Sequence, residues 1–129
     1  MENQSPAPAG KLISQTIAMP RETNANGDIF GGWLLSEMDL AGAILAGRIA
    51  QGRVATVAIS SMSFLSPVPV GAVVGCYAHT LSVGSSSMRV SIEAWIEADH
   101  QADSSKVTEG EFVFVAIDDQ GNKRSVPKP

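Results

Sequence analysis

Apolar positions along the chain follow two different periods, and the change of period divides the sequence into elements. Residues 33–50 contain no proline and are rich in Leu, Met, Ala and Ile, and Gly52 follows as a natural stop. This segment is therefore predicted to be a helix. Before it, apolar and polar residues alternate over residues 11–18, which predicts a first strand.

After the helix the period becomes that of β-strands. Four segments rich in β-branched residues and bounded by turn formers are predicted strands: 54–64, 73–83, 88–98 and 107–117. The connections between them contain Pro67-Val68-Pro69 with Gly71, then Gly84-Ser85-Ser86-Ser87, then the polar stretch 99–105. Such connections are typical of hairpins, so the sheet is predicted to be mostly antiparallel.

One strand, a long helix and four further strands predict an α+β domain with the helix across an antiparallel sheet. The helix spans about 27 Å and a ten-residue strand about 33 Å, so the helix can lie along the sheet as its cover. It carries only three charged residues, Glu37, Asp39 and Arg48, which predicts burial on nearly all sides. A five-stranded sheet wrapped around a long central helix is the hotdog fold.

This domain is predicted to span residues 11–118. Residues 1–10 are expected to form a disordered lead-in, because they contain two prolines and no apolar core. The polar, proline-containing segment 119–129 is expected to form a loose C-terminal tail.

Composition adds expectations about partners. Hydrophobic residues make up 44% of the chain and charged residues 17%, fewer charges than usual for a soluble monomer, so part of the apolar surface is expected to meet another subunit. Nine Lys and Arg against thirteen Asp and Glu give a net charge of -4 without a basic run. A nucleic-acid partner is disfavoured, because phosphate neutralisation supplies most of that affinity. Locally placed Arg or Lys residues could still hold a ligand with a few phosphates.

Cysteine and histidine are too sparse for a disulfide or a metal centre. Cys76 is the only cysteine and stands in an apolar run, which predicts a buried structural thiol. Neither His79 nor His100 has a Cys, an Asp or a second His at metal-ligand spacing, so no metal is expected. The first ten residues resemble neither a signal peptide nor a membrane span, so a cytoplasmic location without a membrane partner is expected.

Asp39 stands in the middle of the predicted helix, and its neighbours one turn away are Leu35, Ser36, Gly42 and Ala43. A carboxylate with so few polar neighbours is usually paired or hydrogen-bonded. It is also suited to act as a general base. Glu37 competes for this role, because its helical neighbours are equally apolar and periodicity does not choose between the two.

The stretch from Asn24 to Trp33 is crowded with turn formers and ends in Gly31 and Gly32 at the predicted start of the helix. Unpaired N–H groups and the positive end of the helix dipole can stabilise an oxyanion there. Glycine also lets a carbonyl group approach the backbone closely. The alternative is that both glycines only shape a tight turn.

Two turns offer groups that could hold phosphates. One is the hairpin Gly84 to Ser87, followed by Arg89, and the other is the helix exit Gln51-Gly52-Arg53. Each of them could equally be an ordinary exposed turn.

A series of motifs covers roughly residues 11–125. They are Met19-Pro20, Thr23-Asn24-Ala25-Asn26-Gly27-Asp28-Ile29-Phe30-Gly31-Gly32-Trp33, Ser36-Glu37-Met38-Asp39, Ala41-Gly42-Ala43-Ile44, Gly52-Arg53-Val54-Ala55-Thr56-Val57-Ala58, Met62-Ser63-Phe64-Leu65-Ser66-Pro67-Val68, Val70-Gly71, Ser87-Met88 and Glu93-Ala94-Trp95. In these motifs the chain resembles the YciA-type acyl-CoA thioesterases. The resemblance implies a hotdog subunit that hydrolyses acyl-CoA to a carboxylic acid and CoA without a metal or organic cofactor. It also implies a homodimer with two active sites at its interface, commonly assembled into a hexameric trimer of dimers.

The resemblance assigns roles to individual residues. The family's helix aspartate falls on Asp39, as general base or nucleophile, and the amides of Gly31 and Gly32 would polarise the thioester carbonyl. Asp28 stands where some related thioesterases have an asparagine that helps to place the water or the thioester across the dimer interface. Further residues in or beside these motifs are predicted to bind the substrate and its CoA moiety: Asn24, Asn26, Phe30, Arg53, Phe64, Ser86, Ser87 and Arg89.

Other functions stay open from the sequence. A hotdog hydratase or dehydratase would use an Asp and His pair, and no such spacing occurs near the helix. A non-catalytic acyl-CoA binding or sensing module would make Asp39 a structural interface residue. A serine-histidine-acid triad is disfavoured because the Gly-x-Ser-x-Gly elbow is missing. Departures from the family pattern at Ser60 and Gln51 leave the preferred acyl group undetermined.

Overall fold

The computed structural model describes residues 7–128. Its elements in chain order are β1 (Lys11–Ile17), a 3-10 turn (Pro20–Glu22), α1 (Gly31–Ala50), β2 (Val54–Phe64), β3 (Val73–Val83), β4 (Ser87–Ile96) and β5 (Ser105–Ala116). The predicted order of one strand, a long helix and four strands is confirmed. The predicted disordered lead lies largely outside the described residues.

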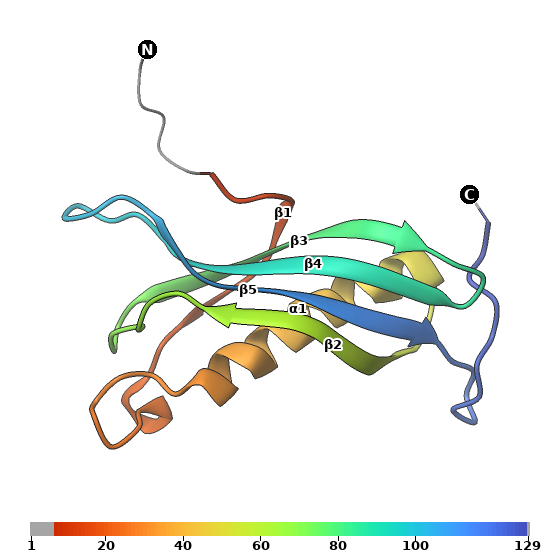
Figure 1. Cartoon of the computed structure of the whole chain (residues 1–129), viewed down its shortest axis with the longest axis horizontal. Coiled ribbons are helices and arrows are strands. Elements are labelled where there is room, and N and C mark those ends of the chain that lie inside the picture. The colour runs from red at the N-terminus through yellow and green to blue at the C-terminus, as the bar shows by residue number, and fades with distance from the viewer. Residues whose placement is uncertain (1–6, 129) are drawn as a thin grey trace, which may run out of the picture.

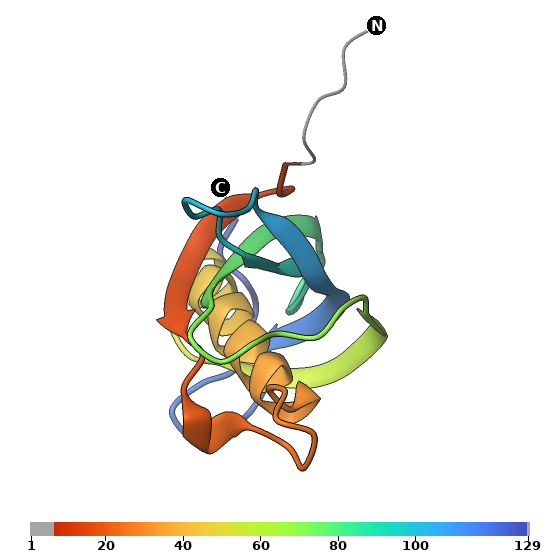
Figure 2. The same ribbon diagram turned by 90° about the vertical axis from the view of Figure 1, so that its left-hand side faces the viewer.

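The five strands form one sheet in the order β1-β3-β4-β5-β2, and every neighbouring pair is antiparallel. The sheet curls around α1, which contacts each of the five strands (Figures 1 and 2). This is the predicted hotdog arrangement. It leaves two edge strands, β1 and β2.

The core lies between α1 and the concave face of the sheet. Met88, Val90 and Ile92 alternate along β4 and are fully buried against the helix, as the period of two requires. Gly42 of α1 faces the same layer, and a Cβ atom there would lie 2.5 Å from Cδ1 of Ile92 and 2.8 Å from Cζ of Phe114. The helix approaches the sheet this closely only because position 42 has no side chain.

One face of α1 is open, so the prediction of a helix buried on nearly all sides is wrong for the single chain. The residues at every fourth position, Gly32, Ser36, Leu40, Ile44 and Arg48, are exposed, because the curled sheet does not close around the helix. Leu40 is 59% and Ile44 42% exposed, which is unusual for large apolar side chains on a helix. In the described part of the chain, no helix combines the length and apolar character that crossing a membrane would need.

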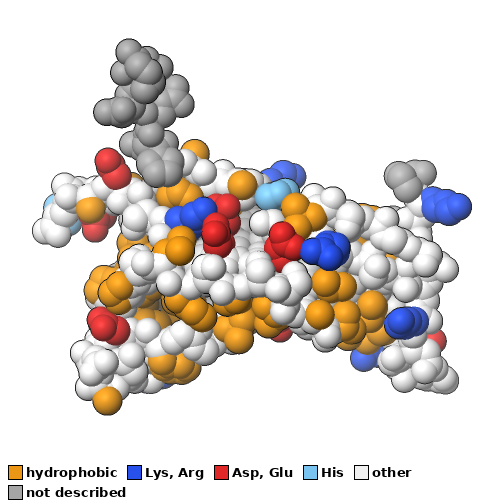
Figure 3. All heavy atoms as spheres, in the orientation of Figure 1, with side chains coloured by type: hydrophobic (Ala, Val, Ile, Leu, Met, Phe, Trp, Pro, Cys, Tyr) orange, Lys and Arg blue, Asp and Glu red, His pale blue; other side chains and the backbone are white. Residues whose placement is uncertain are grey.

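The β2 edge is also apolar and uncovered. Val57 is 55% and Phe64 54% exposed, and two register shifts interrupt the pairing of β2 with β5. Figure 3 shows hydrophobic side chains gathered along the margin of the molecule where β2 runs. An unpaired, apolar edge strand is a template for pairing with another chain.

The C-terminal segment is fastened to the domain through Arg124 and Val126, so the prediction of a loose tail is wrong up to Val126. Arg124 donates from Nη2 to the carbonyl oxygen of Ala50 at the end of α1 (2.9 Å) and from Nε to that of Ile117 (3.0 Å). Val126 is 8% exposed, and its N–H donates to the carbonyl oxygen of Ser85 (2.7 Å). A lone valine in a polar segment gives no periodic signal, which is why the sequence pattern missed this attachment.

Two glycines of α1 are expected to respond oppositely to replacement by alanine. Gly42→Ala should lower the free energy of unfolding by about 1–3 kcal/mol, because the new methyl group overpacks the core. Gly47→Ala should raise it by about 0.5–1 kcal/mol, because the added Cβ meets only an ordinary contact at 3.5 Å and alanine favours the helix. Urea unfolding at one protein concentration measures both, and a stabilised Gly42→Ala variant would contradict the packing described above.

Candidate active site

Asp39 reaches from α1 to the open edge of the sheet. Its Oδ1 accepts a hydrogen bond from the hydroxyl of Thr56 on β2 at 2.6 Å. The carboxylate is therefore held in one orientation beside an edge strand that has no neighbour on its outer side. This is the polar partner that the sequence required for a carboxylate among apolar neighbours.

Glu37 points to the opposite edge. Two residues along a helix differ by about 200° around its axis, and the Oε1 of Glu37 accepts a hydrogen bond from the hydroxyl of Thr16 on β1 at 2.8 Å. Periodicity could not choose between the two carboxylates, but the strands that they contact separate them. Only Asp39 faces the apolar β2 edge.

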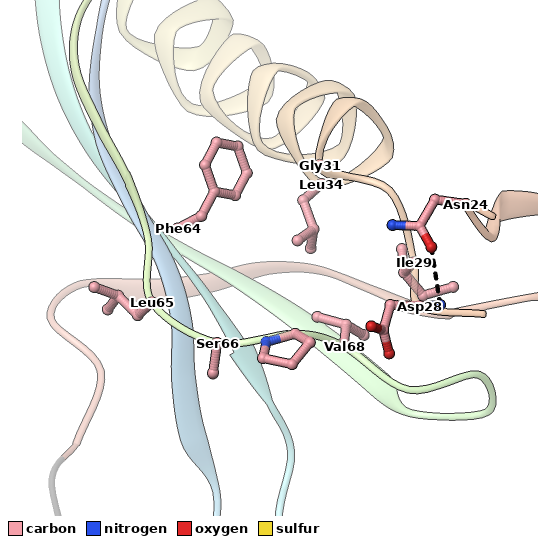
Figure 4. Close-up of a pocket in the computed structure, with 10 residues that line it drawn as sticks. Asn24, Asp28, Ile29, Gly31, Leu34, Phe64, Leu65, Ser66 and Val68 are labelled. Atoms are coloured by element: carbon pink, nitrogen blue, oxygen red, sulfur yellow. Dashed lines mark hydrogen bonds between the residues drawn. The ribbon is translucent and has the colours of Figure 1, made fainter. Parts of the chain in front are cut away.

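A cavity of about 400 Å³ lies at the start of α1 (Figure 4). Four of the predicted site residues line it together: Asn24, Asp28, Gly31 and Phe64. The rest of its wall is mostly apolar and comes from Ile29, Leu34, Leu65, Ser66, Pro67 and Val68. A mostly apolar wall with a few polar groups on one side is typical of a small-molecule site.

Asn24 organises the loop that forms the polar side of this cavity. Its Oδ1 accepts hydrogen bonds from the N–H groups of Asn26 (2.9 Å) and Asp28 (3.2 Å), and its own N–H donates to the carbonyl oxygen of Asp28 (2.7 Å). Gly27 completes the turn with a φ of 84°, a conformation that favours glycine. Asn26 stays exposed at the loop tip.

The helix begins at Gly31, two residues earlier than predicted, so both glycines belong to its first turn. Phe30, which is exposed, precedes them and gives no side-chain cap. Within residues 7–128 the N–H groups of Gly31 and Gly32 donate to no acceptor, so they are available to a ligand. A Cβ on Gly31 would lie 3.1 Å from the Phe64 ring, which explains glycine at this position.

The remaining predicted residues lie elsewhere. Arg53, Ser86 and Ser87 belong to the end of the molecule where α1 finishes and β4 starts, opposite the loop that contains Asn24 (Figure 1). Arg89 forms an ion pair with Glu111 of β5, with 2.6 Å between Nη2 and Oε1. The guanidinium group predicted to bind CoA is thus paired with a carboxylate of the same chain.

Sequence reasoning missed Thr56 and the apolar wall formed by Leu34, Leu65 and Val68. Thr56 is a polar residue between alanine and valine on a predicted strand, and that interruption was the available signal. Its partner is 17 positions away on another element, which no local pattern reveals.

Comparison with known proteins decides the family. Residues 26–102 match the family model of the thioesterase superfamily. The acyl-CoA thioester hydrolase YciA of Escherichia coli is 48% identical over 123 residues, which are 93% of either chain. The chain belongs to the YciA-type acyl-CoA thioester hydrolases.

Two solved structures extend the comparison from sequence to geometry. A hexameric thioesterase from Yersinia pestis is 50% identical with a TM-score of 0.90, over 95% of this chain and all of that one. An acyl-CoA hydrolase from Staphylococcus aureus, in complex with butyryl coenzyme A, is 30% identical with a TM-score of 0.82, over 88% of this chain and 70% of that one. This thioesterase chain thus shares its fold over nearly its whole length with both enzymes.

Cys76, the single cysteine of this thioesterase, lies on β3, apart from Asp39 and Thr56. Burial raises the pKa of Cys76 from 9.0 to about 11, against a smaller opposing effect of a hydrogen bond with Ser14. A protonated, fully buried thiol is a poor nucleophile, in agreement with its predicted structural role. Among the described residues, no three His, Cys, Asp or Glu side chains are grouped so that they could hold a metal ion.

The buried thiol should make stability depend on pH in the alkaline range. Because the folded-state pKa of Cys76 is the higher one, its contribution is complete below pH 9.0 and is lost as the pH rises to about 11. Wild-type protein should therefore lose about 2 kcal/mol more than Cys76→Ala between pH 8 and pH 10.5. Urea unfolding at pH 8 and pH 10.5 measures this difference. An equal loss in both proteins would show that the thiol is not protected by burial.

Proposed function

We propose that this protein hydrolyses acyl-CoA thioesters to a free carboxylic acid and CoA, at a site assembled from two copies of the chain. The observation that carries the proposal is the hydrogen-bonded pair of Asp39 and Thr56 at an apolar sheet edge with no neighbouring strand. The relatives named above are acyl-CoA hydrolases and thioesterases, and a held carboxylate is suited to general-base hydrolysis of a thioester, which supports the proposal.

In the proposed reaction the Asp39 carboxylate takes a proton from water as the water oxygen bonds to the thioester carbon. Negative charge develops on the carbonyl oxygen, where the free N–H groups at the start of α1 would stabilise it. The C–S bond then breaks, and the CoA thiolate leaves and accepts the proton that Asp39 took from the water, which restores the carboxylate. Thr56 fixes the orientation of the base. The proposal needs no metal or organic cofactor, because the carboxylate and the backbone supply both functions.

The spacing of three residues supports this assignment. In the Staphylococcus aureus enzyme, an asparagine, an aspartate and a threonine have each been replaced by alanine, and they follow one another at intervals of 15 and 17 residues. Asn24, Asp39 and Thr56 stand at the same two intervals here. We therefore assign the amide that places the water or the thioester to Asn24, and leave to Asp28 a role in shaping the loop.

The site needs a second copy because its parts are too far apart within one chain. Gly31 and Asp39 are separated by eight residues, about 12 Å along the helix. An N–H donor and a base that act on one carbonyl group must each lie within about 3 Å of the reacting atoms or of one bridging water. The first turn of α1 and Asp39 of the same chain do not meet this requirement.

Antiparallel pairing of two β2 strands would bring the N–H donors of one chain close enough to the base of the other. Gly31 packs on Phe64 at the end of β2, and Asp39 bonds to Thr56 near its start. A two-fold axis at Ser60, midway between these positions, would set Thr56 of one copy beside the partner's Phe64. The helix N-terminus of one copy would then face the carboxylate of the other. The exposed Leu40 and Ile44 would be covered at the same time.

We further propose that such dimers assemble into a hexamer as a trimer of dimers. The Yersinia pestis relative, which matches 95% of this chain, is hexameric. The pairing of β2 edges closes only a dimer, so a hexamer requires a second kind of interface on each subunit.

Replacement of the proposed base should abolish most turnover. Asp39→Asn is expected to lower kcat by about a thousandfold, the range that general-base catalysis contributes, in an assay of thiol release from a panel of acyl-CoA esters. Glu37→Gln is the matched control on the same helix and should keep nearly full activity. Unchanged turnover in Asp39→Asn would refute the assignment. If the wild type released thiol from none of the esters but still bound CoA, the protein would be a binding module.

Removal of the positioning hydroxyl should have a smaller effect on the same step. Thr56→Val keeps the shape of the side chain but removes the donor to Asp39, and should lower kcat about tenfold to a hundredfold with little change in KM. Thr80→Val, on an exposed part of β3, is the control for replacing a strand threonine. A Thr56→Val enzyme with wild-type kcat would show that Asp39 does not depend on this hydrogen bond.

A further inference from the structure

The loop before α1 is shaped by the backbone of Asp28 and not by its side chain. The N–H of Asp28 donates to Oδ1 of Asn24 (3.2 Å), and its carbonyl oxygen accepts from the N–H of Asn24 (2.7 Å). Within residues 7–128 its carboxylate forms neither a hydrogen bond nor an ion pair. Many residue types could supply the two backbone groups, so the loop does not account for a carboxylate at this position.

The side chain of Asp28 stands in the wall of the cavity at the start of α1 (Figure 4). It is half-buried, and the next residue, Ile29, donates its N–H to the carbonyl oxygen of Val68 (3.1 Å), which holds the loop against the other wall. Asp28 is the only charged residue of this wall, and within residues 7–128 no Lys or Arg lines the cavity. Its negative charge therefore acts on a ligand without a neighbouring cation to compensate it.

The cavity suits the acyl chain of the substrate better than the CoA part. In the proposed reaction the thioester carbonyl lies at the N–H groups of Gly31 and Gly32, and Gly31 lines the cavity. An acyl chain that continues from this carbonyl is apolar, as are the side chains of Leu34 and Val68 in the wall, so its burial there is favourable. The phosphates of CoA, in contrast, would be repelled by the carboxylate of Asp28.

We propose that Asp28 determines which acyl groups the enzyme accepts, by repelling those that end in a carboxylate. The inference rests on the proposed thioester hydrolysis and adds a substrate class to it. A neutral aliphatic chain buries its methyl end in the cavity without meeting a like charge. A dicarboxylic acyl chain of the same length brings a second negative charge into a half-buried site that already has one. The preferred substrates are therefore neutral acyl-CoA esters.

The position of Asp28 allows it to act on the far end of a medium-length chain. Asp28 precedes Gly31 by three residues, which span at most about 10 Å, so a chain that starts at the carbonyl site can extend toward its carboxylate. The other carboxylate of the proposed site, the partner's Asp39, acts at the thioester, which is the same in every ester. Its effect cancels when two esters that differ only at the far end are compared.

The test compares hexanoyl-CoA with adipyl-CoA, which has a chain of the same length but ends in a carboxylate. Wild-type protein should hydrolyse hexanoyl-CoA with the higher kcat/KM, after correction for hydrolysis without enzyme. Asp28→Asn keeps the shape of the side chain but removes its charge, and should lower the ratio of the two kcat/KM values about tenfold, mainly by a gain for adipyl-CoA. Asp28→Ala should lower the ratio in the same direction, because it also removes the charge.

Asp103→Asn is the matched control, since it removes one negative charge from the loop between β4 and β5, outside this cavity. It should leave the ratio unchanged. A uniform loss of activity in the Asp28 variants, as from a disturbed loop, would lower both kcat/KM values and leave their ratio as in the wild type. That result would overturn the inference, as would a wild type without preference for hexanoyl-CoA, or an equal change of the ratio in Asp103→Asn. If the wild type hydrolysed neither ester, the proposed function would be refuted, and the inference with it.

Discussion

The uncovered edge of β2 is the constraint on which the rest of the molecule depends. The sheet curls around α1 but stops at β2, so an apolar strand edge and an apolar stripe of the helix are left facing the same side. An exposed apolar strand edge tends to pair with another chain. A large exposed apolar patch, such as the strand edge together with the helix stripe, is typical of an interaction surface. Asp39 and Thr56 form a polar pair in this region, where the second chain of the proposed dimer would dock. In the proposed dimer, burial of the edge would therefore also complete the site.

A small fold gains from this arrangement. Thioester hydrolysis requires a base and oxyanion donors. The groups proposed for these roles, Asp39 and the N–H groups of Gly31 and Gly32, lie at different levels of the same helix. The proposed antiparallel pair of chains would bring the first turn of one helix to the middle of the other.

Local pattern predicted the elements well because each has a clear period. The long helix, the strands 54–64 and 73–83, and the buried Cys76 all follow from positions read within one window of sequence. The features that were missed depend on contacts between elements. Thr56 matters through a helix residue 17 positions away, and Val126 is buried by a hairpin about 40 positions earlier. The open face of α1 could not be predicted, because its apolar residues look like core residues until the sheet is seen to stop short.

The choice of Asp39 over Glu37 shows where the sequence pattern reaches its limit. Both carboxylates have apolar helical neighbours, so composition and periodicity treat them alike, and family resemblance was needed to prefer one. In the structure the preference has a physical cause, because Glu37 is bonded to Thr16 on β1 while Asp39 is bonded to Thr56 at the other edge. A two-residue offset on a helix thus separates a structural contact from the proposed catalytic one.

Complementation between two inactive variants measures the shared site most directly. Asp39→Ala and Asn24→Ala chains, distinguished by different affinity tags, are co-expressed, and the mixed oligomers are purified and assayed with an acyl-CoA. If the base and the placing amide come from different chains, a mixed dimer contains one intact site, and random pairing should restore about a quarter of wild-type activity. Mixed oligomers with no activity above that of the separate variants would contradict a site shared between two chains.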